Sequence, residues 1–524
     1  MSTTRIIVKN TSLNLVNLFS IAVFAFLTSI VVARSLGPDR MGVYSYLLWV
    51  LEIGSVAVNL GLLNTGMRYI GEALGRHELE LARHLSGRFF KIEISLGLVI
   101  SALIVLFSIF GRNLFDARAA APMLLLPIAL LPASLNNFFN AINRGWQRFG
   151  AIAWSGVLTS LASFLLIWWT ASRTGDLSQI ILWLAVANAL GLAIYVGAFS
   201  RIERSALITK NIIEGNLKRR LVRYSLALSV LVVCELIVWQ KSEVFFLAFF
   251  TDSQTVAFYS LAFTMALAAV AYLPNAFISL LTPMVSSRFG QFNEIGVIEN
   301  FSAAALRYVL FLAVPLAVGV TLLIHPIVTF LYGPAYQSVS SVFPLLALAS
   351  VGSVITGVFS ASLLGMERQK IFLFIILGVT VVNLILDFSL IPVWGLMGAA
   401  LANLSAQLGA CFLSAIYLRQ RIGFRLLDWP WLARLTAASA IIGLSLWPIS
   451  QLADAGLAVS LGALVWVGAT YSALWLTRCW QAQDLERFDE LTEGSPTLRK
   501  IVRFILKPVY WQLNHRHHGP AASV

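Results

Sequence analysis

Charged side chains are scarce in this sequence. Asp, Glu, Lys and Arg make up 12% of its 524 residues, whereas hydrophobic residues make up 59%. A soluble domain carries about 25% charged residues, so this composition excludes a water-soluble globular protein. Apolar stretches of about 20 residues recur, and each can cross a ~30 Å hydrocarbon layer as a helix. We therefore expect an all-α polytopic membrane protein.

Cysteine is also scarce, with only Cys234, Cys411 and Cys479 in the chain. They fall in predicted spans or on the predicted cytoplasmic side, where disulfides are not expected, and no Cys/His spacing indicates a metal site. Catalytic signatures such as HExxH, a P-loop or GxGxxG in a βαβ context are missing. We expect no enzyme activity, no ATP hydrolysis by the chain itself, no organic cofactor and no metal centre.

Hydropathy predicts fourteen transmembrane helices. Arg5 and Lys9 precede the first apolar run, which exceeds the 7–15 residues of a signal-peptide core and lacks a small-residue cleavage site, so we interpret it as a retained helix. The spans lie near residues 12–33, 41–63, 89–110, 120–141, 149–172, 178–199, 224–250, 255–281, 303–331, 338–363, 371–391, 395–418, 430–452 and 456–476.

Basic residues are distributed unevenly between the two sides of these spans. With the N-terminus inside, thirty-one of the thirty-seven Lys and Arg residues fall on the inner side, if Lys91, Arg307 and Arg434 in the inner ends of spans are included. Five fall on the outer side, and Lys241 lies deeper within a span. The positive-inside rule then places both termini in the cytoplasm. Topology and anionic headgroups explain the net charge of +13, so we expect membrane lipids as partners and no nucleic acid.

Three sequence matches in order indicate an internal duplication. The pairs are residues 41–45 with 256–260 and 187–188 with 402–403 at a shift of 215, and 145–148 with 365–368 at a shift of 220. Because six spans is an even number, both copies start on the same side of the membrane. We therefore expect two six-helix lobes related by a pseudo-two-fold axis along the membrane normal and enclosing a cavity, with two further helices outside the repeat.

This duplication defines the expected domain boundaries. They are an N-terminal lobe at 1–200, a basic cytoplasmic linker at 201–223, a C-terminal lobe at 224–418, helices 13 and 14 at 419–476, and a cytoplasmic amphipathic tail at 477–524.

Several short motifs resemble one superfamily. They are Ala33-Arg34-Ser35-Leu36-Gly37-Pro38 with Gly42-Val43-Tyr44, Arg68-Tyr69-Ile70, Lys241-Ser242-Glu243, Phe258-Tyr259-Ser260 and the segment 392–400. Over about residues 1–480 the chain resembles the multidrug/oligosaccharidyl-lipid/polysaccharide exporters, and within them the polysaccharide flippases. The resemblance implies a bacterial inner-membrane protein that moves an undecaprenyl-pyrophosphate-linked oligosaccharide to the outer leaflet by alternating access, with a polysaccharide polymerase as a possible partner.

Polar residues at helical spacing are the candidate cargo ligands. Span 1 carries Asn10, Asn14 and Asn17, span 2 carries Glu52, Ser55 and Asn59, and span 4 carries Asn136, Asn140 and Asn143. They line a wet cavity, or they hold helices together through hydrogen bonds.

Charged residues within spans are costly and therefore indicate function or pairing. We expect Lys241 to bind the pyrophosphate, as a point charge with three donors, and Arg68 to receive it or to serve as a positive-inside anchor. Glu235, Glu243, Glu52 and Asp387 are the candidate groups for H⁺ or Na⁺ coupling. A structural pairing with a neighbouring helix is the alternative for Lys241, Glu235, Glu243 and Asp387.

Two other functions remain open on the sequence. A cation-coupled drug or metabolite exporter would use the same acids, although Lys241 and the two additional spans argue against it. A membrane polysaccharide polymerase or ligase would need a sizeable outer loop, and no predicted outer segment exceeds roughly a dozen residues.

Overall fold

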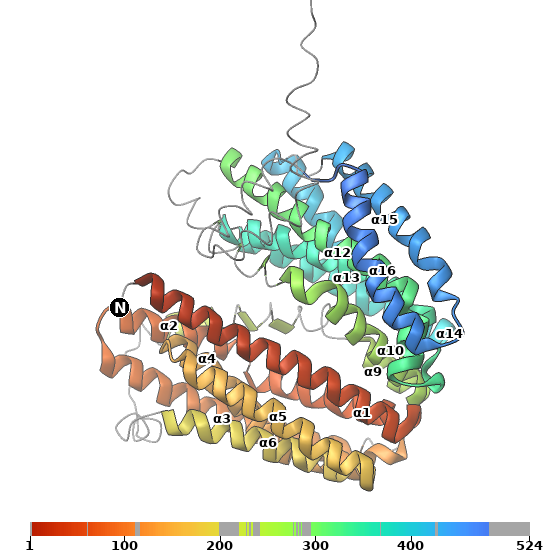
Figure 1. Cartoon of the computed structure of the whole chain (residues 1–524). Helices are drawn as coiled ribbons and strands as arrows, with labels where there is room; N and C mark the ends of the chain where they lie inside the picture. Colours follow the sequence, from red (N-terminus) through yellow and green to blue (C-terminus); the bar gives the residue numbers. More distant parts are fainter. Residues whose placement is uncertain are drawn as a thin grey trace, which may run out of the picture. The chain divides into compact units, whose positions relative to one another are not determined.

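The computed structural model describes most of the chain. The described residues are 3–59, 61–110, 116–198, 219–226, 228–229, 232–233, 242–275, 277–278, 281, 285, 295–366, 368–424 and 428–480. Every regular element among them is a helix (Figure 1). The amphipathic tail beyond residue 480 and most of the predicted linker lie outside these residues.

Seven helices come from the first 200 residues. They are α1 (Thr3–Asn59), α2 (Leu62–Gly75), α3 (Leu79–Phe110), η1 (Ala117–Ala119), α4 (Ala120–Gly145), α5 (Phe149–Arg173) and α6 (Leu177–Ala198). The later elements are α9 (Glu243–Phe250), α10 (Ser253–Ala266), η2 (Leu267–Ala271), α12 (Ile295–Leu331), η3 (Pro334–Tyr336), α13 (Val339–Gly365), α14 (Gln369–Tyr417), η4 (Leu418–Ile422), α15 (Trp429–Ser450) and α16 (Ala455–Leu476).

Two of these helices bend at a glycine and each contains two predicted spans. In α1 the bend is at Gly37 (φ 72, ψ 172), directly before Pro38, and in α14 it is at Gly395 (φ 50, ψ −122). Glycine accepts these positive φ angles because it has no Cβ. Gly175, which the 220-residue shift aligns with Gly395, also has a positive φ of 61° between the fifth and sixth spans of its set.

Eleven helical segments in the described chain are long and apolar enough to cross a membrane. Two of them, the segments that contain the α1 and α14 bends, each hold two spans, so together they account for thirteen of the fourteen predicted spans. In the remaining span, 224–250, residues 227, 230–231 and 234–241 lie outside the described residues. The predicted all-α polytopic membrane class is confirmed.

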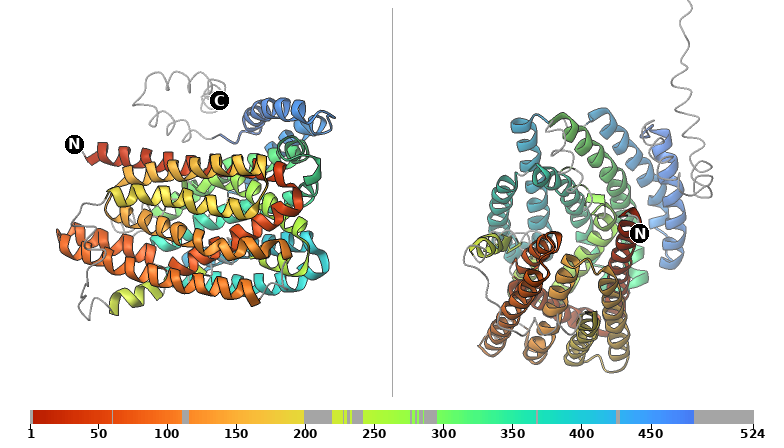
Figure 2. Two further views of the ribbon diagram at one scale, coloured as in Figure 1. Left: turned by 90° about the horizontal axis from the view of Figure 1, so that it is seen from below. Right: turned by 90° about the vertical axis from the view of Figure 1, so that its left-hand side faces the viewer.

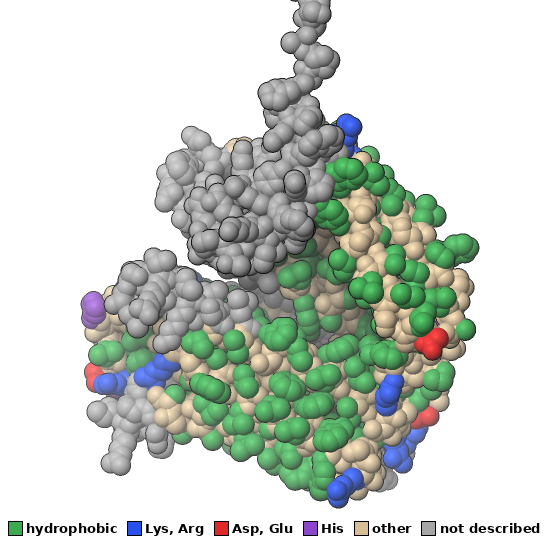
Figure 3. All heavy atoms as spheres, in the orientation of Figure 1, with side chains coloured by type: hydrophobic (Ala, Val, Ile, Leu, Met, Phe, Trp, Pro, Cys, Tyr) green, Lys and Arg blue, Asp and Glu red, His purple; other side chains and the backbone are tan. Residues whose placement is uncertain are grey.

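The surface fits a lipid environment. On the face drawn in Figure 3, hydrophobic side chains cover the helix flanks, and Lys and Arg gather toward the helix ends. Large apolar side chains such as Phe19, Leu98 and Trp154 are more than half exposed. Such side chains would be unfavourable in water and are stable against acyl chains.

The chain forms two compact units. Unit 1 comprises the described residues within 1–268, 331–349 and 369–410, and unit 2 those within 269–330, 350–368 and 411–524. The expected lobe boundaries stay a prediction. In unit 1, α1 packs on α5 and α10, while α4 packs on α3 and α6. Figure 2 shows the helices of the first 200 residues running alongside one another.

Helix α2 is a feature that the hydropathy pattern does not predict. Gly61 (φ 70) interrupts the chain after α1, and Leu62, Tyr69 and Ile70 bury one face of α2 in a core with α3 and α4. Arg68 lies on the opposite, exposed face. The helix is amphipathic, so an average over a window of residues misses it.

Unit 2 contains the two helices outside the repeat. Helices α15 and α16 pack together, and Asp428 and Asp454 cap their N-termini by accepting hydrogen bonds from the backbone N–H of Trp431 and Leu457. Trp466 of α16 donates from Nε1 to the Pro315 carbonyl of α12 at 3.0 Å.

Candidate functional site

Unit 1 contains a cavity of about 480 Å³, which we call the asparagine cavity and which both apolar and polar side chains line. Helices α1, α4, α5, α6 and α10 all contribute to its lining. Its polar residues are Asn17, Thr28, Ser29, Tyr44, Ser45, Glu52, Asn136, Asn137, Asn140, Ser155, Thr159, Ser160, Ser163, Asn188, Tyr195, Ser260 and Thr264. Glu52 is the one charged residue among the described lining residues.

The amides of α4 are held by hydrogen bonds from the neighbouring helices. Asn136 donates from Nδ2 to Asn188 Oδ1 of α6 at 3.2 Å, and its Oδ1 accepts from Ser155 Oγ of α5 at 3.2 Å. Asn140 donates to the Tyr195 hydroxyl at 3.1 Å. These side chains therefore hold helices together and also line the cavity. Both roles that the sequence predicts for the polar residues of α4 apply to the same side chains.

Arg144 fixes the far end of this stripe. Its Nε donates to Asn140 Oδ1 at 2.9 Å, one helical turn along α4. The arginine is not itself a lining residue. The sequence predicts Arg144 only as one of the basic residues on the cytoplasmic side.

The candidates on α1 separate into two groups. Asn17 is buried and lines the cavity, where its side chain packs directly against Gly156 of α5. Glu52 also lines the cavity. Asn59 is buried elsewhere and donates back to the Ser55 carbonyl of its own helix at 2.6 Å. The side chain of Asn14 lies outside the described residues.

A second polar site, the acid cluster, is buried in unit 1. It comprises Ser242 and Glu243 of the α9 N-terminus, Tyr259 of α10, and Asn383, Asp387 and Asn403 of α14. Glu243, Asp387 and Asn383 have no exposed surface. An ionised group so deep in a membrane protein needs partners, a proton or a cation.

Hydrogen bonds connect the two carboxylates of this cluster to its serine and asparagine side chains. Asp387 Oδ2 accepts from Ser242 Oγ at 3.0 Å and from Asn383 Nδ2 at 2.9 Å. Glu243 Oε1 accepts from Asn403 Nδ2 at 3.0 Å. No described residue donates to Asp387 Oδ1 or Asn383 Oδ1. The cluster thus offers buried oxygen atoms that can accept a proton or coordinate a hard cation.

Asn403 and Asn383 were not candidates on the sequence, although signals for both were available. The duplication aligns Asn403 with Asn188, and each of these asparagines lies in one of the two polar sites. Asn383 precedes Asp387 by one helical turn, the spacing that singled out the other stripes.

A third feature, the arginine–tyrosine stack, lies at the end of unit 1 opposite the α1 bend. The Arg68 guanidinium lies 4.6 Å from the ring centroid of Tyr224, and that of Arg220 lies 5.3 Å from the ring centroid of Tyr69. The two rings meet edge to face at 5.7 Å. Glu72 is 3.8 Å from Arg220 and 2.7 Å from Arg76. Arg68 is therefore placed by aromatic faces.

Lys241 and Glu235 lie outside the described residues, so their predicted roles stay predictions. Of the remaining candidates, the structure brings Asn17, Glu52, Asn136 and Asn140 together around one cavity. It brings Glu243 and Asp387 together in the acid cluster.

Comparisons with known proteins agree with this architecture. Residues 7–289, more than half of the chain, match the model of the polysaccharide biosynthesis protein family. Among solved structures, the lipid II flippase MurJ in an inward closed conformation is similar with a TM-score of 0.67 and 15% identity over 88% of this chain and 99% of that one. No curated protein sequence matches this chain significantly.

Two further structures share the fold. An inward-facing multidrug resistance MATE transporter has a TM-score of 0.66 and 17% identity over 78% of this chain and 98% of its own. A transporter from Pyrococcus furiosus, whose binding pocket is described as having reverse polarity, has a TM-score of 0.57 and 14% identity over 80% of this chain and 95% of its own.

The fold is shared with solved transporters of the multidrug/oligosaccharidyl-lipid/polysaccharide exporter superfamily, which the sequence motifs resemble. Within it, the chain belongs to the polysaccharide biosynthesis protein family.

Proposed function

We propose that the protein is a flippase that moves an undecaprenyl-pyrophosphate-linked oligosaccharide from the inner to the outer leaflet of a bacterial inner membrane. The asparagine cavity carries this proposal. Amides and hydroxyls dominate its polar lining, and they can exchange hydrogen bonds with the many hydroxyls of a glycan. The family match to polysaccharide biosynthesis proteins supports the same class of cargo.

The pyrophosphate needs cations, which the described lining of the cavity does not supply. The arginine–tyrosine stack supports a docking role for Arg68, because Arg68 and Arg220 present two guanidinium groups at one helix end. Lys241 remains our proposed ligand within the transport path. Transport by Lys241→Ala equal to that by Lys241→Arg would remove this role.

We assign coupling to the acid cluster, with H⁺ or Na⁺ as the coupling ion. Glu243 and Asp387 are buried in the membrane-spanning part of unit 1, and amide and hydroxyl oxygens adjoin them. A bound cation or proton would neutralise the carboxylates in one state of the cycle and leave in the other. Glu52 and Glu235 remain secondary candidates.

The topology belongs to the proposal. The basic side faces the cytoplasm with both termini, and the end of unit 1 that holds the α1 bend then faces outward. An association with a polysaccharide polymerase stays a prediction.

The test is a leaflet assay with purified protein in liposomes that contain an undecaprenyl-pyrophosphate-linked oligosaccharide. An impermeant reagent that modifies the sugar reports how much cargo becomes accessible with time. We expect faster exposure than in protein-free liposomes, with a further response to a proton or Na⁺ gradient. A rate equal to that of empty liposomes contradicts the proposal.

A drug exporter is the second candidate, favoured by the likeness to the multidrug resistance transporter. In this case the same liposomes would show gradient-driven movement of a lipophilic cation such as ethidium and no movement of the sugar. ATP hydrolysis by the purified chain would contradict both candidates.

A further inference from the structure

The described wall of the asparagine cavity carries a negative charge. Glu52 lies on the α1 face that also presents Ser45, Leu48 and Trp49 to the cavity, since these residues precede it by seven, four and three positions. Its side chain is exposed, and an exposed glutamate is ionised at neutral pH. Among the described lining residues, no lysine or arginine offsets this charge.

Several hydroxyl groups of the asparagine cavity already donate their hydrogen atoms to the backbone. Thr28, Ser160 and Thr264 each donate to the carbonyl one turn earlier in their own helix, at 2.7, 2.7 and 2.8 Å. Ser155 donates to the Gly191 carbonyl of α6 at 3.0 Å. A hydroxyl has one hydrogen and two lone pairs, so these four oxygens can accept from a ligand but not donate to it.

This hydrogen-bond polarity acts in the same direction as the charge of Glu52. A sugar hydroxyl, an acetamido N–H or an ammonium group can donate to these oxygens and to the carboxylate. The carboxylate of an acidic sugar only accepts, and it would lie near a like charge in a membrane-embedded site where water screens charges weakly. The wall therefore favours ligand groups that donate hydrogen bonds and carry no negative charge.

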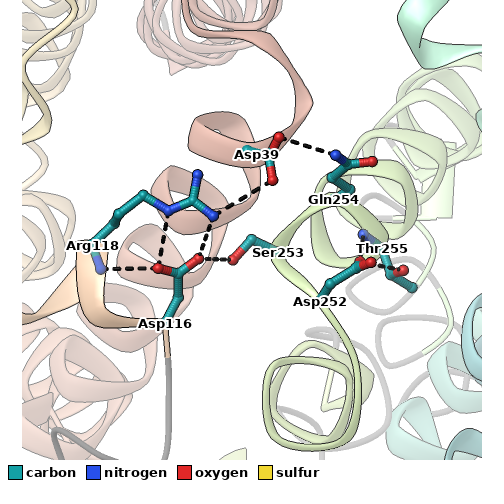
Figure 4. Close-up of polar contacts among 7 residues, drawn as sticks. All are labelled: Asp39, Asp116, Arg118, Asp252, Ser253, Gln254 and Thr255. Atoms are coloured by element: carbon teal, nitrogen blue, oxygen red, sulfur yellow. Dashed lines mark hydrogen bonds and ion pairs between the residues drawn. The ribbon is translucent and has the colours of Figure 1, made fainter.

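A second pocket, of about 290 Å³, lies at the end of unit 1 that holds the α1 bend, and we call it the bend pocket. Figure 4 shows its charged lining residues, which are Asp39 after the bend, Asp116 and Arg118 at η1, and Asp252 before α10. Three acids thus accompany one cation in the described lining.

The acids of the bend pocket stay ionised. Arg118 binds Asp116 at 2.9 and 3.0 Å and approaches Asp39 at 3.5 Å (Figure 4). Partial burial raises the pKa of Asp116, but hydrogen bonds from Arg118 and Ser253 outweigh this effect and hold that pKa below its usual range. One guanidinium cannot neutralise three carboxylates, so the bend pocket is anionic as well.

The asparagine cavity and the bend pocket lie along the same pair of helices, α1 and α10. On α1, Tyr44 lines the cavity and its neighbour Val43 lines the bend pocket. Arg34 and Arg40, which are basic residues near the bend, line neither of them. A glycan that moves from the cavity toward the bend end therefore meets negative charge in both places.

We propose that the protein selects its cargo by the charge of the glycan, accepting uncharged or amine-bearing sugars and disfavouring sugars that carry a carboxylate. The inference rests on the proposed function, in which Lys241 and Arg68 bind the pyrophosphate and the acid cluster binds the coupling ion. Glu52 then acts on the glycan. The charge of the cavity can be measured without any cargo.

The first experiment measures this charge. Leu48→Cys places a thiol one helical turn from Glu52, in a protein whose three native cysteines are replaced by serine. Its labelling rates are measured in detergent with cationic trimethylammonioethyl methanethiosulfonate and with anionic sulfonatoethyl methanethiosulfonate. We expect Glu52→Gln to lower the ratio of the cationic to the anionic rate several-fold, because it removes the charge that attracts one reagent and repels the other.

Two control variants accompany this measurement. Glu52→Asp keeps the charge and should keep the ratio. Glu78→Gln, at an exposed glutamate that does not line the cavity, should also leave the ratio unchanged. Because the same two reagents are used on every variant, their intrinsic reactivities cancel. An equal ratio in Glu52→Gln and its parent protein overturns the inference.

The second experiment measures cargo selection in the leaflet assay. Three undecaprenyl-pyrophosphate-linked disaccharides differ only in their outer sugar, which is glucose, glucosamine or glucuronic acid. We expect an apparent KM for the glucuronic acid cargo that is roughly tenfold or more above that for the glucose cargo. The KM for the glucosamine cargo should be equal to or below that for the glucose cargo, and Glu52→Gln should bring all three closer together.

Equal KM values for the three cargoes, or a preference for glucuronic acid, overturn the inference and leave the flippase function in place. A change of the labelling ratio in Glu52→Gln together with no flipping of any lipid-linked sugar supports the anionic cavity and counts against the proposed function. The two ideas can therefore fail separately.

Discussion

The asparagine cavity and the acid cluster place similar side chains in different surroundings. In the cavity, Asn188 accepts from another amide, Asn136, and the surrounding polar groups are mainly neutral. In the acid cluster, Asn403, which the duplication aligns with Asn188, donates to the buried carboxylate of Glu243.

The difference shows how two aligned helix positions can enter different hydrogen-bond networks. An amide can donate or accept, so its role depends on the partner that the neighbouring helix supplies. Neutral partners make a site for hydroxyl-rich ligands. Buried acids need a partner, a proton or a cation, because an unpaired charge is costly within a membrane.

The largest effect is expected for Glu243→Gln and Asp387→Asn. Each exchange keeps the shape of the side chain and removes the carboxylate, so the flipping rate should fall by roughly tenfold or more and no longer respond to an ion gradient. The leaflet assay with and without the gradient measures both effects. Glu78→Gln, at an exposed residue, is the control.

Retention of the wild-type rate and of the gradient response by both variants would make the acid cluster a structural ion site. Asp387→Leu sharpens this test, because it leaves Ser242 and Asn383 without their acceptor at about 1–3 kcal/mol for each buried group. A fall in Tm is expected for Asp387→Leu, with a much smaller change for Asp387→Asn.

The next largest effect is expected for Gly156→Leu in the cavity wall. A side chain there meets Asn17 directly, so the new side chain must displace that amide or fill part of the cavity. Overpacking typically costs about 1–3 kcal/mol. We expect a strong loss of flipping with little change in Glu243-dependent coupling.

Gly150→Leu on the same helix is the matched control, because its Cβ position has no atoms within 4 Å. Equal flipping by the two variants would show that cargo does not use this wall of the cavity.

A smaller effect is expected for Asn136→Leu. This change removes one amide that bonds Asn188, Ser155 and any sugar hydroxyl nearby. A net loss of about 0.5–1.5 kcal/mol corresponds to roughly a two- to tenfold rise in the apparent KM for the glycan. Asn64→Leu, at an exposed asparagine of α2, serves as control. A change in gradient response, with the KM unaltered, would contradict the separation of the two sites.

The smallest effect is expected for Arg68→Ala, since its side chain is exposed and its stacking is worth about 0.5–1 kcal/mol. We expect a modest loss of flipping that Arg68→Lys only partly restores, because lysine keeps the charge but not the planar group. Arg88→Ala is the control at an exposed arginine. Equal activity of Arg68→Ala and the wild type would leave Arg68 as a membrane anchor.

Much of the fold follows from the sequence, because a span must be long and apolar to exist at all. Some of the bends that separate two spans could also be located from the sequence, as at Gly37-Pro38. The amphipathic α2 was not predicted, since its buried face depends on α3 and α4. The site was predicted in part: the asparagine stripes named Asn17, Asn136 and Asn140, which meet at the cavity, and also Asn59, which does not line it.

The residue pattern by itself determined the membrane class, the spans and the superfamily, because solvation by lipid acts on each helix separately. Only the tertiary structure decided which polar residues share a site. Asp387 meets Ser242 across 145 positions of the chain, and Ser253 meets Asp116 across 137. Such pairings depend on which helix faces pack together, and helical periodicity within one span carries no information about its neighbour.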